Sequence, residues 1–297
     1  MTSKKRRRRK FPHEFWHQKL RGLKRTPHND ANLDAIRCAT RGDAAGGARM
    51  VVNISSAHIP SFCNETANAG ARPYKNIYDL QRLGVGKEPS ATRRRVDTAL
   101  PLPPGKRAED MYFGAVEISG TGIRFYGDIC LVLKPTEVEG DTLILETNSY
   151  DLEREPLVSL ISRAQDQSAK RRLFAKAMSG RWDNDRGDMV ASKVFQMLGQ
   201  RERLFTLGQI AEAVRDDEDY VEVIRAGTFD ANDLEEVRLQ PEDAAVELRI
   251  AEQLRNGMPP SLAEVQWGRD RRRAEMALRA LGIPVRVVTT PGRTKTT

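Results

Sequence analysis

The stretch Met111-Tyr-Phe-Gly-Ala-Val-Glu-Ile118, followed by Ile129-Cys-Leu-Val-Leu133, decides the fold class. The first segment alternates along the chain and is rich in β-forming residues, which is typical of a strand. The second is an uninterrupted apolar run, which is typical of a strand buried on both faces. With a resumed strand at 123–126 and a short strand at 142–145, the pattern predicts a meander of three or four strands.

Helices dominate the chain on the C-terminal side of this meander. Apolar residues at helical spacing predict helices at 157–177, 189–198, 207–214, 241–254 and 261–281, with strands at 220–224 and 283–288. Residues 31–110 are loop-rich, with a strand at 50–55 and an ordered element at 74–83. We therefore predict an α+β fold, in which a basic disordered tail over 1–30 precedes a single α+β domain over 31–297.

Positive charge is concentrated at the N-terminus. Residues 1–30 hold 11 of the 49 basic and 2 of the 41 acidic residues, so the rest of the chain, with 38 basic and 39 acidic residues, is nearly neutral. Adjacent cations repel one another and keep a segment extended. We expect the basic run to bind a polyanion or an import receptor. The run consists of Lys4, Lys5, Arg6, Arg7, Arg8, Arg9 and Lys10.

Hydropathy and cysteine usage bear on location. No run of about 18 apolar residues predicts a transmembrane helix, and the basic N-terminus lacks the apolar stretch of a secretory signal. Three scattered cysteines indicate neither a disulfide framework nor a CxxC pair. We therefore expect no membrane partner and a cytoplasmic location, or the nucleus of a host cell if the basic run is an import signal. His13 and His17 lack a third ligand, so no metal site is expected.

Two segments together carry a resemblance to a known family. The first is Tyr126-Gly-Asp-Ile-Cys-Leu-Val-Leu-Lys134, followed by Asn148-Ser-Tyr150, and the second is Tyr220-Val-Glu-Val-Ile-Arg-Ala-Gly227, followed by 230–237. In this order they resemble the ADP-ribosyltransferase superfamily, in particular its bacterial toxin-like branch, over about a fifth of the chain. The resemblance implies split small β-sheets with flanking helices. It also implies a mono-ADP-ribosyltransferase that uses NAD to modify a protein or nucleic-acid acceptor.

The resemblance assigns three residues to the reaction centre. Glu222 is the expected catalytic residue, a carboxylate that stabilises the positive charge developing on the ribose as nicotinamide leaves. Ser149 is expected to shape the nicotinamide pocket, and Tyr150 to stack on the nicotinamide ring.

The family also uses an early histidine or arginine to contact the NAD. His58, just after a predicted strand, is the expected residue, with Arg94 or Arg95 as alternatives. Many members carry a second Glu or Gln two residues from the catalytic glutamate. Here those positions are Tyr220 and Ile224, which leaves the nature of the acceptor open.

Two other function classes stay open. One is a nucleic-acid-binding protein or metal-dependent nuclease anchored by the basic tail, with Asp128, Asp141 and Glu146 as candidate metal-binding carboxylates. A helix at 207–214 would suit a helix-turn-helix, and the predicted helix from 261 adds a basic cluster formed by Arg269, Arg271, Arg272 and Arg273. The other class is a non-catalytic interaction protein without a cofactor, whose tail sets its location.

Overall fold

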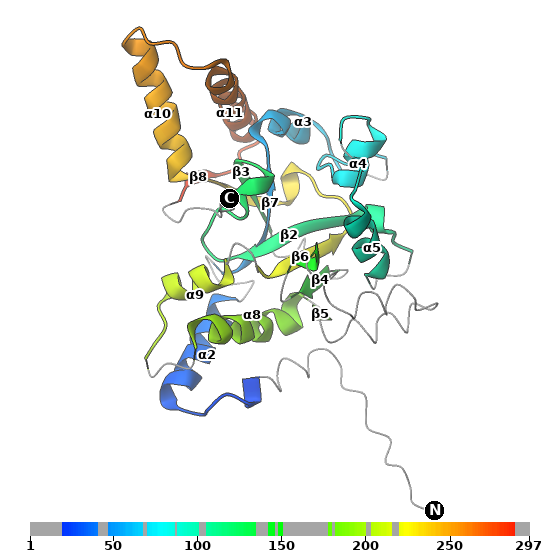
Figure 1. The fold of residues 1–297 in the computed structure, drawn as a ribbon, viewed down its shortest axis with the longest axis vertical. Helices are drawn as coiled ribbons and strands as arrows, with labels where there is room; N and C mark the ends of the chain where they lie inside the picture. Colours follow the sequence, from blue (N-terminus) through cyan, green and yellow to red (C-terminus); the bar gives the residue numbers. More distant parts are fainter. Residues whose placement is uncertain are drawn as a thin grey trace, which may run out of the picture.

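In the computed structural model, the described residues are 20–40, 47–67, 70–86, 88–100, 105–134, 142–145, 148–150, 178–179, 182–199, 203–215 and 220–288. One mixed sheet of eight strands runs through them in the order β5-β4-β6-β2-β1-β3-β7-β8 (Figure 1). Neighbouring strands pair antiparallel, except β7 and β8, which are parallel. The predicted α+β class is therefore confirmed.

The elements have the following bounds. The strands are β1 (Arg49–Ile54), β2 (Met111–Glu117), β3 (Ile129–Leu133), β4 (Thr142–Leu145), β5 (Met178–Ser179), β6 (Glu222–Ala226), β7 (Leu234–Leu239) and β8 (Val285–Val287). The helices are α2 (Pro27–Ala39), α3 (Ile59–Asn64), α4 (Ile77–Arg82), α5 (Ala91–Ala99), α8 (Trp182–Leu198), α9 (Leu207–Val214), α10 (Pro241–Arg255) and α11 (Leu262–Ala280). Short 3₁₀ helices include η1 (Ser56–His58) and η3 (Arg124–Tyr126).

The strands expected to form a meander do not pair with one another. β2 lies between β1 and β6, and β3 lies between β1 and β7, so the neighbours come from distant parts of the chain. The segment expected to resume a strand at 123–126 holds η3 instead. Among the described residues the strands also form one sheet, so the expectation of split small sheets is wrong there. Period-two patterning marks a strand but carries no information about which strand lies beside it.

The ordered chain begins earlier than expected. Leu20 is buried in the main core, and α2 begins at Pro27, directly after its N-cap Thr26, whose hydroxyl accepts from the backbone N–H of Asn29 at 3.1 Å. A proline in the first turn and a hydroxyl N-cap are both favourable helix starts. Helix α2 therefore begins within the segment 1–30 that the sequence assigned to the tail. The basic run Lys4–Lys10 and the helix expected at 157–177 lie outside the described residues.

The region expected to be loop-rich, 31–110, holds more helix than its composition suggested. α3, α4 and α5 all fall there. α4 lies within the ordered element expected at 74–83, and it starts with a capping box between Asn76 and Asp79. Among the described helices, none is long and apolar enough to cross a membrane.

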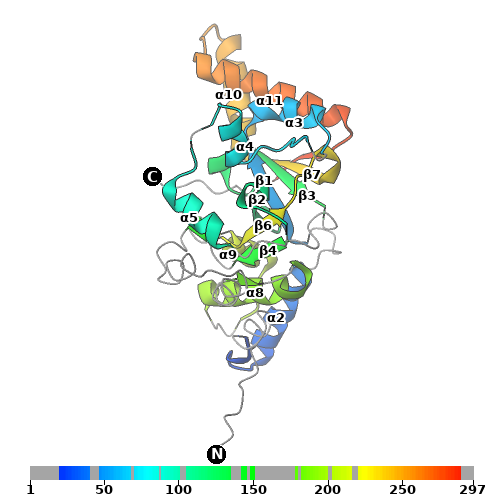
Figure 2. The same cartoon turned by 90° about the vertical axis from the view of Figure 1, so that its right-hand side faces the viewer.

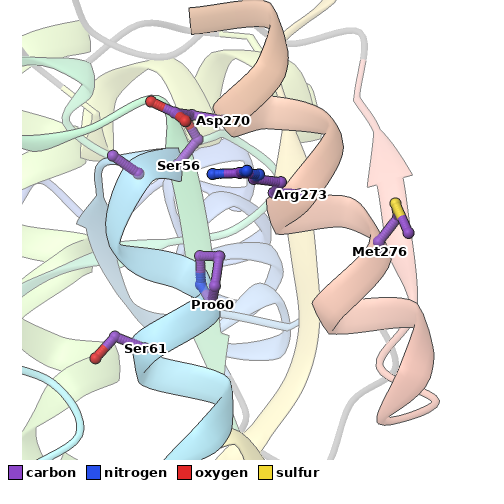
Figure 3. A pocket seen from close by; sticks show the side chains of 7 residues that line it. Ser56, Pro60, Ser61, Asp270, Arg273 and Met276 are labelled. Atoms are coloured by element: carbon purple, nitrogen blue, oxygen red, sulfur yellow. The ribbon is translucent and has the colours of Figure 1, made fainter. Parts of the chain in front are cut away.

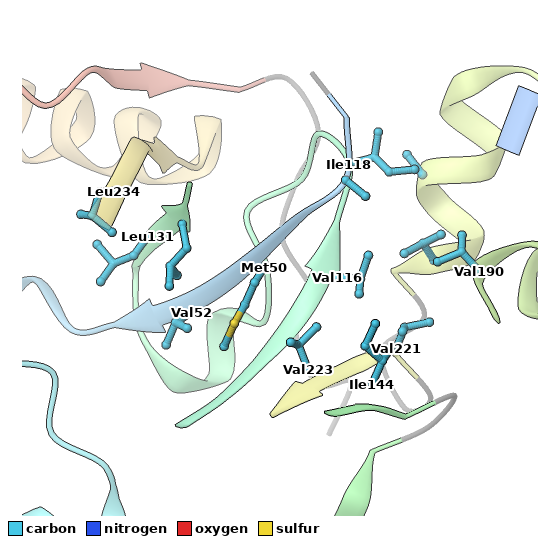
Figure 4. Close-up of a cluster of buried hydrophobic side chains, with 14 of the residues drawn as sticks. Met50, Val52, Val116, Ile118, Leu131, Ile144, Val190, Val221, Val223 and Leu234 are labelled. Atoms are coloured by element: carbon cyan, nitrogen blue, oxygen red, sulfur yellow. The ribbon is translucent and has the colours of Figure 1, made fainter. Parts of the chain in front are cut away.

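The main core lies on one face of the sheet. Alternate strand residues such as Met50, Val52, Val116 and Val223 belong to this core, which also includes Val190 of α8 (Figure 4) and buried residues of α9. The opposite face carries a smaller apolar cluster of Val51, Ala115, Cys130, Val132 and Tyr220. Because side chains alternate along a strand, Glu222 shares this second face with Tyr220.

A buried asparagine fixes the segment 118–128 to the end of β1. The Asn53 amide donates to the carbonyl oxygens of Thr121 at 2.9 Å and Gly127 at 3.1 Å, and its Oδ1 accepts from the Ile123 N–H at 2.8 Å. Gly127 lies so close to β1 that a Cβ there would stand 2.1 Å from the carbonyl carbon of Ile54. The Tyr126-Gly-Asp motif is thus a close packing point in this fold.

Candidate active site around Glu222

Glu222 is the first residue of β6 and lies between two antiparallel neighbours. It is paired with Ala115 of β2 on one side and with Leu145 of β4 on the other. The residue is only 2% exposed. The sheet therefore holds a carboxyl group inside the molecule, where an ionised form is costly unless hydrogen bonds or a cation compensate.

The turn at 148–150, which follows β4 in the chain, supplies that hydrogen bond. The chain leaves β4 at Leu145, opposite Glu222, and reaches Ser149 four residues later. The backbone N–H of Ser149 donates to Oε2 of Glu222 at 2.8 Å, and Ser149 is itself fully buried. The structure thus brings together Glu222 and Ser149, two of the three residues that the resemblance assigned to the reaction centre.

Helix α5 adds a cation that the sequence reading missed. Arg93 donates from Nη1 to the hydroxyl of Ser149 at 3.1 Å and from Nε to Asp97 at 2.6 Å. Its guanidinium also lies over the ring of Phe113, 4.1 Å from the centroid. Arg93 is the first of three consecutive arginines and lies four residues before Asp97. Residues at this spacing are neighbours on the surface of a helix, so the spacing was the signal that could have distinguished Arg93 from the other two.

The environment of Glu222 raises its pKa from the ordinary 4.5 to about 7, chiefly because burial removes the carboxylate from water. The nearby charge of Asp97 acts in the same direction. The charge of Arg93 and the hydrogen bonds from Ser149 oppose that increase. Glu222 can therefore exchange a proton near neutral pH, which is a property common among groups that take part in chemistry.

Tyr150 and Arg94 lie at the surface beside this cluster. Tyr150 is 44% exposed, and its hydroxyl is 3.2 Å from the hydroxyl of Ser90, the N-cap of α5. Arg94 is exposed and pairs with Glu88 at 3.5 Å. Arg93, rather than Arg94, is thus the arginine of α5 that contacts Ser149.

His58 lies in a different part of the structure. It is exposed at the end of η1, which packs with α3 against α11 (Figure 2). The contacts of Glu222 come instead from the turn after β4, with α5 behind it. The structure therefore does not join His58 to the Glu222 cluster.

A pocket of about 530 Å³ lies beside the segment that holds His58. Figure 3 shows η1 and α3 on one side and α11 on the other. Its lining is mixed, with apolar, hydroxyl and charged groups from Ser56, Ala57, Pro60, Ser61, Asp270, Arg273 and Met276. None of these residues belongs to the Glu222 cluster.

The residues suggested for a nuclease are used structurally where they are described. Asp128 accepts from the backbone N–H of Ser56 at 2.8 Å, and Arg271 lies 3.7 Å from its other oxygen. Asp141 and Glu146 lie outside the described residues. Within the described ranges, no three His, Cys, Asp or Glu residues are grouped in a way that could hold a metal ion.

The four arginines of the basic cluster on α11 differ in how far they are buried. Arg271 is 1% exposed and lies among the carboxylates of Asp128, Asp243 and Glu247. The other three arginines of the cluster are exposed. The helix therefore does not present all four arginines to one nucleic-acid surface.

The cluster of Glu222, Ser149 and Arg93 unites a strand, a turn and a helix that are far apart in the chain. It combines a buried carboxyl group, a fixed backbone donor and a guanidinium. No family model, no curated protein and no solved structure matches this chain.

Proposed function

We propose that this protein is a mono-ADP-ribosyltransferase that takes NAD as a substrate and uses Glu222 as its catalytic carboxylate. The observation that carries the proposal is the hydrogen bond between Ser149 and Glu222, which are 73 positions apart in the chain. A solvent-facing strand glutamate and an ordinary turn serine would have no reason to meet in the interior. The proposal for these residues comes from the family resemblance, and their contact supports it.

The chemistry follows from the position of the carboxylate. Cleavage of the bond between nicotinamide and ribose builds positive charge on the ribose, and a fixed negative group nearby stabilises that charge. Such a group has a larger effect in a water-poor interior than at the surface. The Ser149 N–H holds Glu222 in one orientation, so little reorganisation is needed during the reaction.

NAD needs an opening to reach this carboxylate. Glu222 and Ser149 are both buried, whereas Tyr150 and the N-cap residue Ser90 lie at the surface above them. We infer that NAD enters by displacing the contact between Tyr150 and Ser90. Tyr150 is then available to stack on the nicotinamide ring.

The direct test measures nicotinamide release from NAD by the full-length protein. We expect Glu222→Gln to lower the rate by about 100-fold or more, because the substitution removes the charge that stabilises the transition state. Glu212→Gln, on the exposed side of α9, is the matched control and should retain the wild-type rate. Equal rates in the wild type and Glu222→Gln would refute the proposal.

The acceptor and the location form a separate part of the proposal. The seven adjacent cations at 4–10 favour a polyanion partner, either nucleic acid or an import receptor. Cys38, Cys63 and Cys130 are all free thiols, which favours a reducing compartment.

Salt-titrated DNA binding separates the tail from the folded part. A protein lacking residues 1–10 should bind DNA more weakly, with a smaller dependence of affinity on salt. Binding that survives this deletion unchanged would favour the alternative, in which the folded part is itself a nucleic-acid-binding module.

A further inference from the structure

Arg93 has each of its guanidinium nitrogens hydrogen-bonded within the protein. Nε and Nη2 donate to Oδ1 of Asp97, and Nη1 donates to the Ser149 hydroxyl. The Phe113 ring covers one face of the guanidinium. An arginine committed in this way has little capacity left to bind the phosphates of a ligand.

The partner of Arg93 is itself fixed. Asp97 is fully buried in α5, and its second oxygen accepts from the hydroxyl of Tyr78 at 2.7 Å. Its neighbour Val96 is fully buried as well. Asp97 thus holds Nε and Nη2 of Arg93, while Nη1 reaches the Ser149 hydroxyl.

We propose that Arg93 is a positioning residue of the Glu222 site, which locks the Ser149 turn against Glu222 and, together with Asp97, balances the charge of that carboxylate. The effect of this role on catalysis rests on the proposed function. The positioning itself is a property of the folded chain and can be measured without a substrate.

The titration of Glu222 can distinguish the effect of Arg93 from that of Asp97, and it depends on all charged and titratable groups around Glu222. Arg93 and Asp97 face it from α5, Ser149 from the turn after β4, and Tyr220 from its own strand, with Tyr126 next to Tyr220. Arg93 favours the ionised form of Glu222, and Asp97 opposes it. Removing each charge should therefore move the titration of Glu222 in opposite directions.

The experiment is a carboxyl ¹³C NMR titration of the full-length protein, with the Glu222 signal identified by its loss in Glu222→Gln. In Arg93→Gln we expect the Glu222 midpoint to rise by about 1 pH unit, and in Asp97→Asn we expect it to fall. Arg272→Gln, which removes an exposed arginine of α11, is the charge control and should leave the midpoint unchanged.

A purely structural role for Arg93 would give a different pattern. Loosening of the site would let water reach Glu222 and would lower its midpoint in both variants, because hydration favours the carboxylate. That result, or an unchanged midpoint in a folded Arg93→Gln protein, overturns the proposal. If Arg93→Gln fails to fold by circular dichroism, Arg93→Lys replaces it. This variant keeps the charge but loses the fork that joins Asp97 to the Ser149 hydroxyl, so its midpoint should rise by less than about 1 pH unit, and an unchanged midpoint would overturn the proposal.

The kinetic arm separates this inference from the proposed function. If the wild type releases nicotinamide, the midpoint of its kcat–pH profile should move in the same two directions. A protein that shows the expected titrations but no NAD cleavage retains the positioning role and loses the transferase assignment. Cleavage that depends on Glu222, with no shift in Arg93→Gln, overturns the positioning role alone.

Discussion

The backbone N–H of Ser149 lies 2.8 Å from Oε2 of Glu222, inside the molecule. A main-chain donor cannot rotate away as a side chain can, so the carboxyl group is held wherever the sheet places the turn after β4. The protonation state of Glu222 then becomes the variable that solution conditions control.

Catalysis should therefore depend on pH. The pKa of Glu222 is about 7, and the ionised form is the one that stabilises a ribosyl cation. The rate of nicotinamide release at saturating NAD should rise about tenfold from pH 6 to pH 8 and then level off. A rate measured from pH 5.5 to pH 9 that stays constant across this range would contradict the role of Glu222.

The same group should affect stability in the opposite sense. Since its pKa in the folded protein lies above the unfolded value of 4.5, folding favours the protonated form. The stability contribution is complete below pH 4.5 and is lost as pH rises through about 7, by about 3 kcal/mol. In Glu222→Gln this loss is absent, so the variant should gain stability relative to the wild type between pH 5 and pH 8. Urea unfolding at both pH values measures the difference, and parallel behaviour of the two proteins would contradict it.

Gly127→Ala should destabilise the fold strongly. The added Cβ would stand 2.1 Å from the Ile54 carbonyl carbon, so β1 or the segment 118–128 must move. We expect a loss of at least about 2 kcal/mol in the free energy of unfolding. Gly268→Ala in α11 is the control, because its Cβ meets nothing within 4 Å and alanine favours a helix by up to about 1 kcal/mol. Similar melting temperatures for the two variants would show that the fold accommodates a Cβ at position 127 without loss of stability.

Arg271→Met should remove one cation from the carboxylates of Asp128 and Asp243, although Asp243 keeps its ion pair with Arg124. Arg271 lies 3.8 Å from Asp243 and 3.7 Å from Asp128, and we expect a destabilisation of about 3–5 kcal/mol at pH 8. Burial raises the pKa of Asp243, so protonation should relieve part of this loss at acid pH. Arg272→Met, at the exposed neighbouring position, should change stability by less than about 0.5 kcal/mol. Chemical denaturation at pH 5 and pH 8 compares the two.

Local elements could be predicted from the sequence where the start signal and the periodicity agree. The helix at 207–214 has the predicted bounds, and a capping box between Thr206 and Gln209 marks its start. The strand at 129–133 was equally clear, because a short apolar run between turn residues has few alternatives. Strand order was not predictable. The neighbours of β3 in the sheet are β1, which comes much earlier in the chain, and β7, which comes much later.

The candidate site, like the fold, could be predicted only in part from the sequence. Glu222 and Ser149 could be named from the resemblance, but nothing in the local pattern showed that they touch. Arg93 stands in a run of three arginines, where composition treats all members alike and only the helix orientation selects one. His58 was selected because it follows a strand, yet η1 directs that segment towards α11. In each case the missing information was three-dimensional: the direction of a side chain or the course of the chain after a strand.

The pairing of Leu145 with Glu222 has an evolutionary consequence. Three residues, 146–148, separate Leu145 from Ser149 in the sequence, and this number decides where the backbone donor arrives. An insertion or deletion in this connection would carry the donor past the carboxyl group. Descendants of this gene should therefore keep the spacing between Leu145 and Ser149 constant.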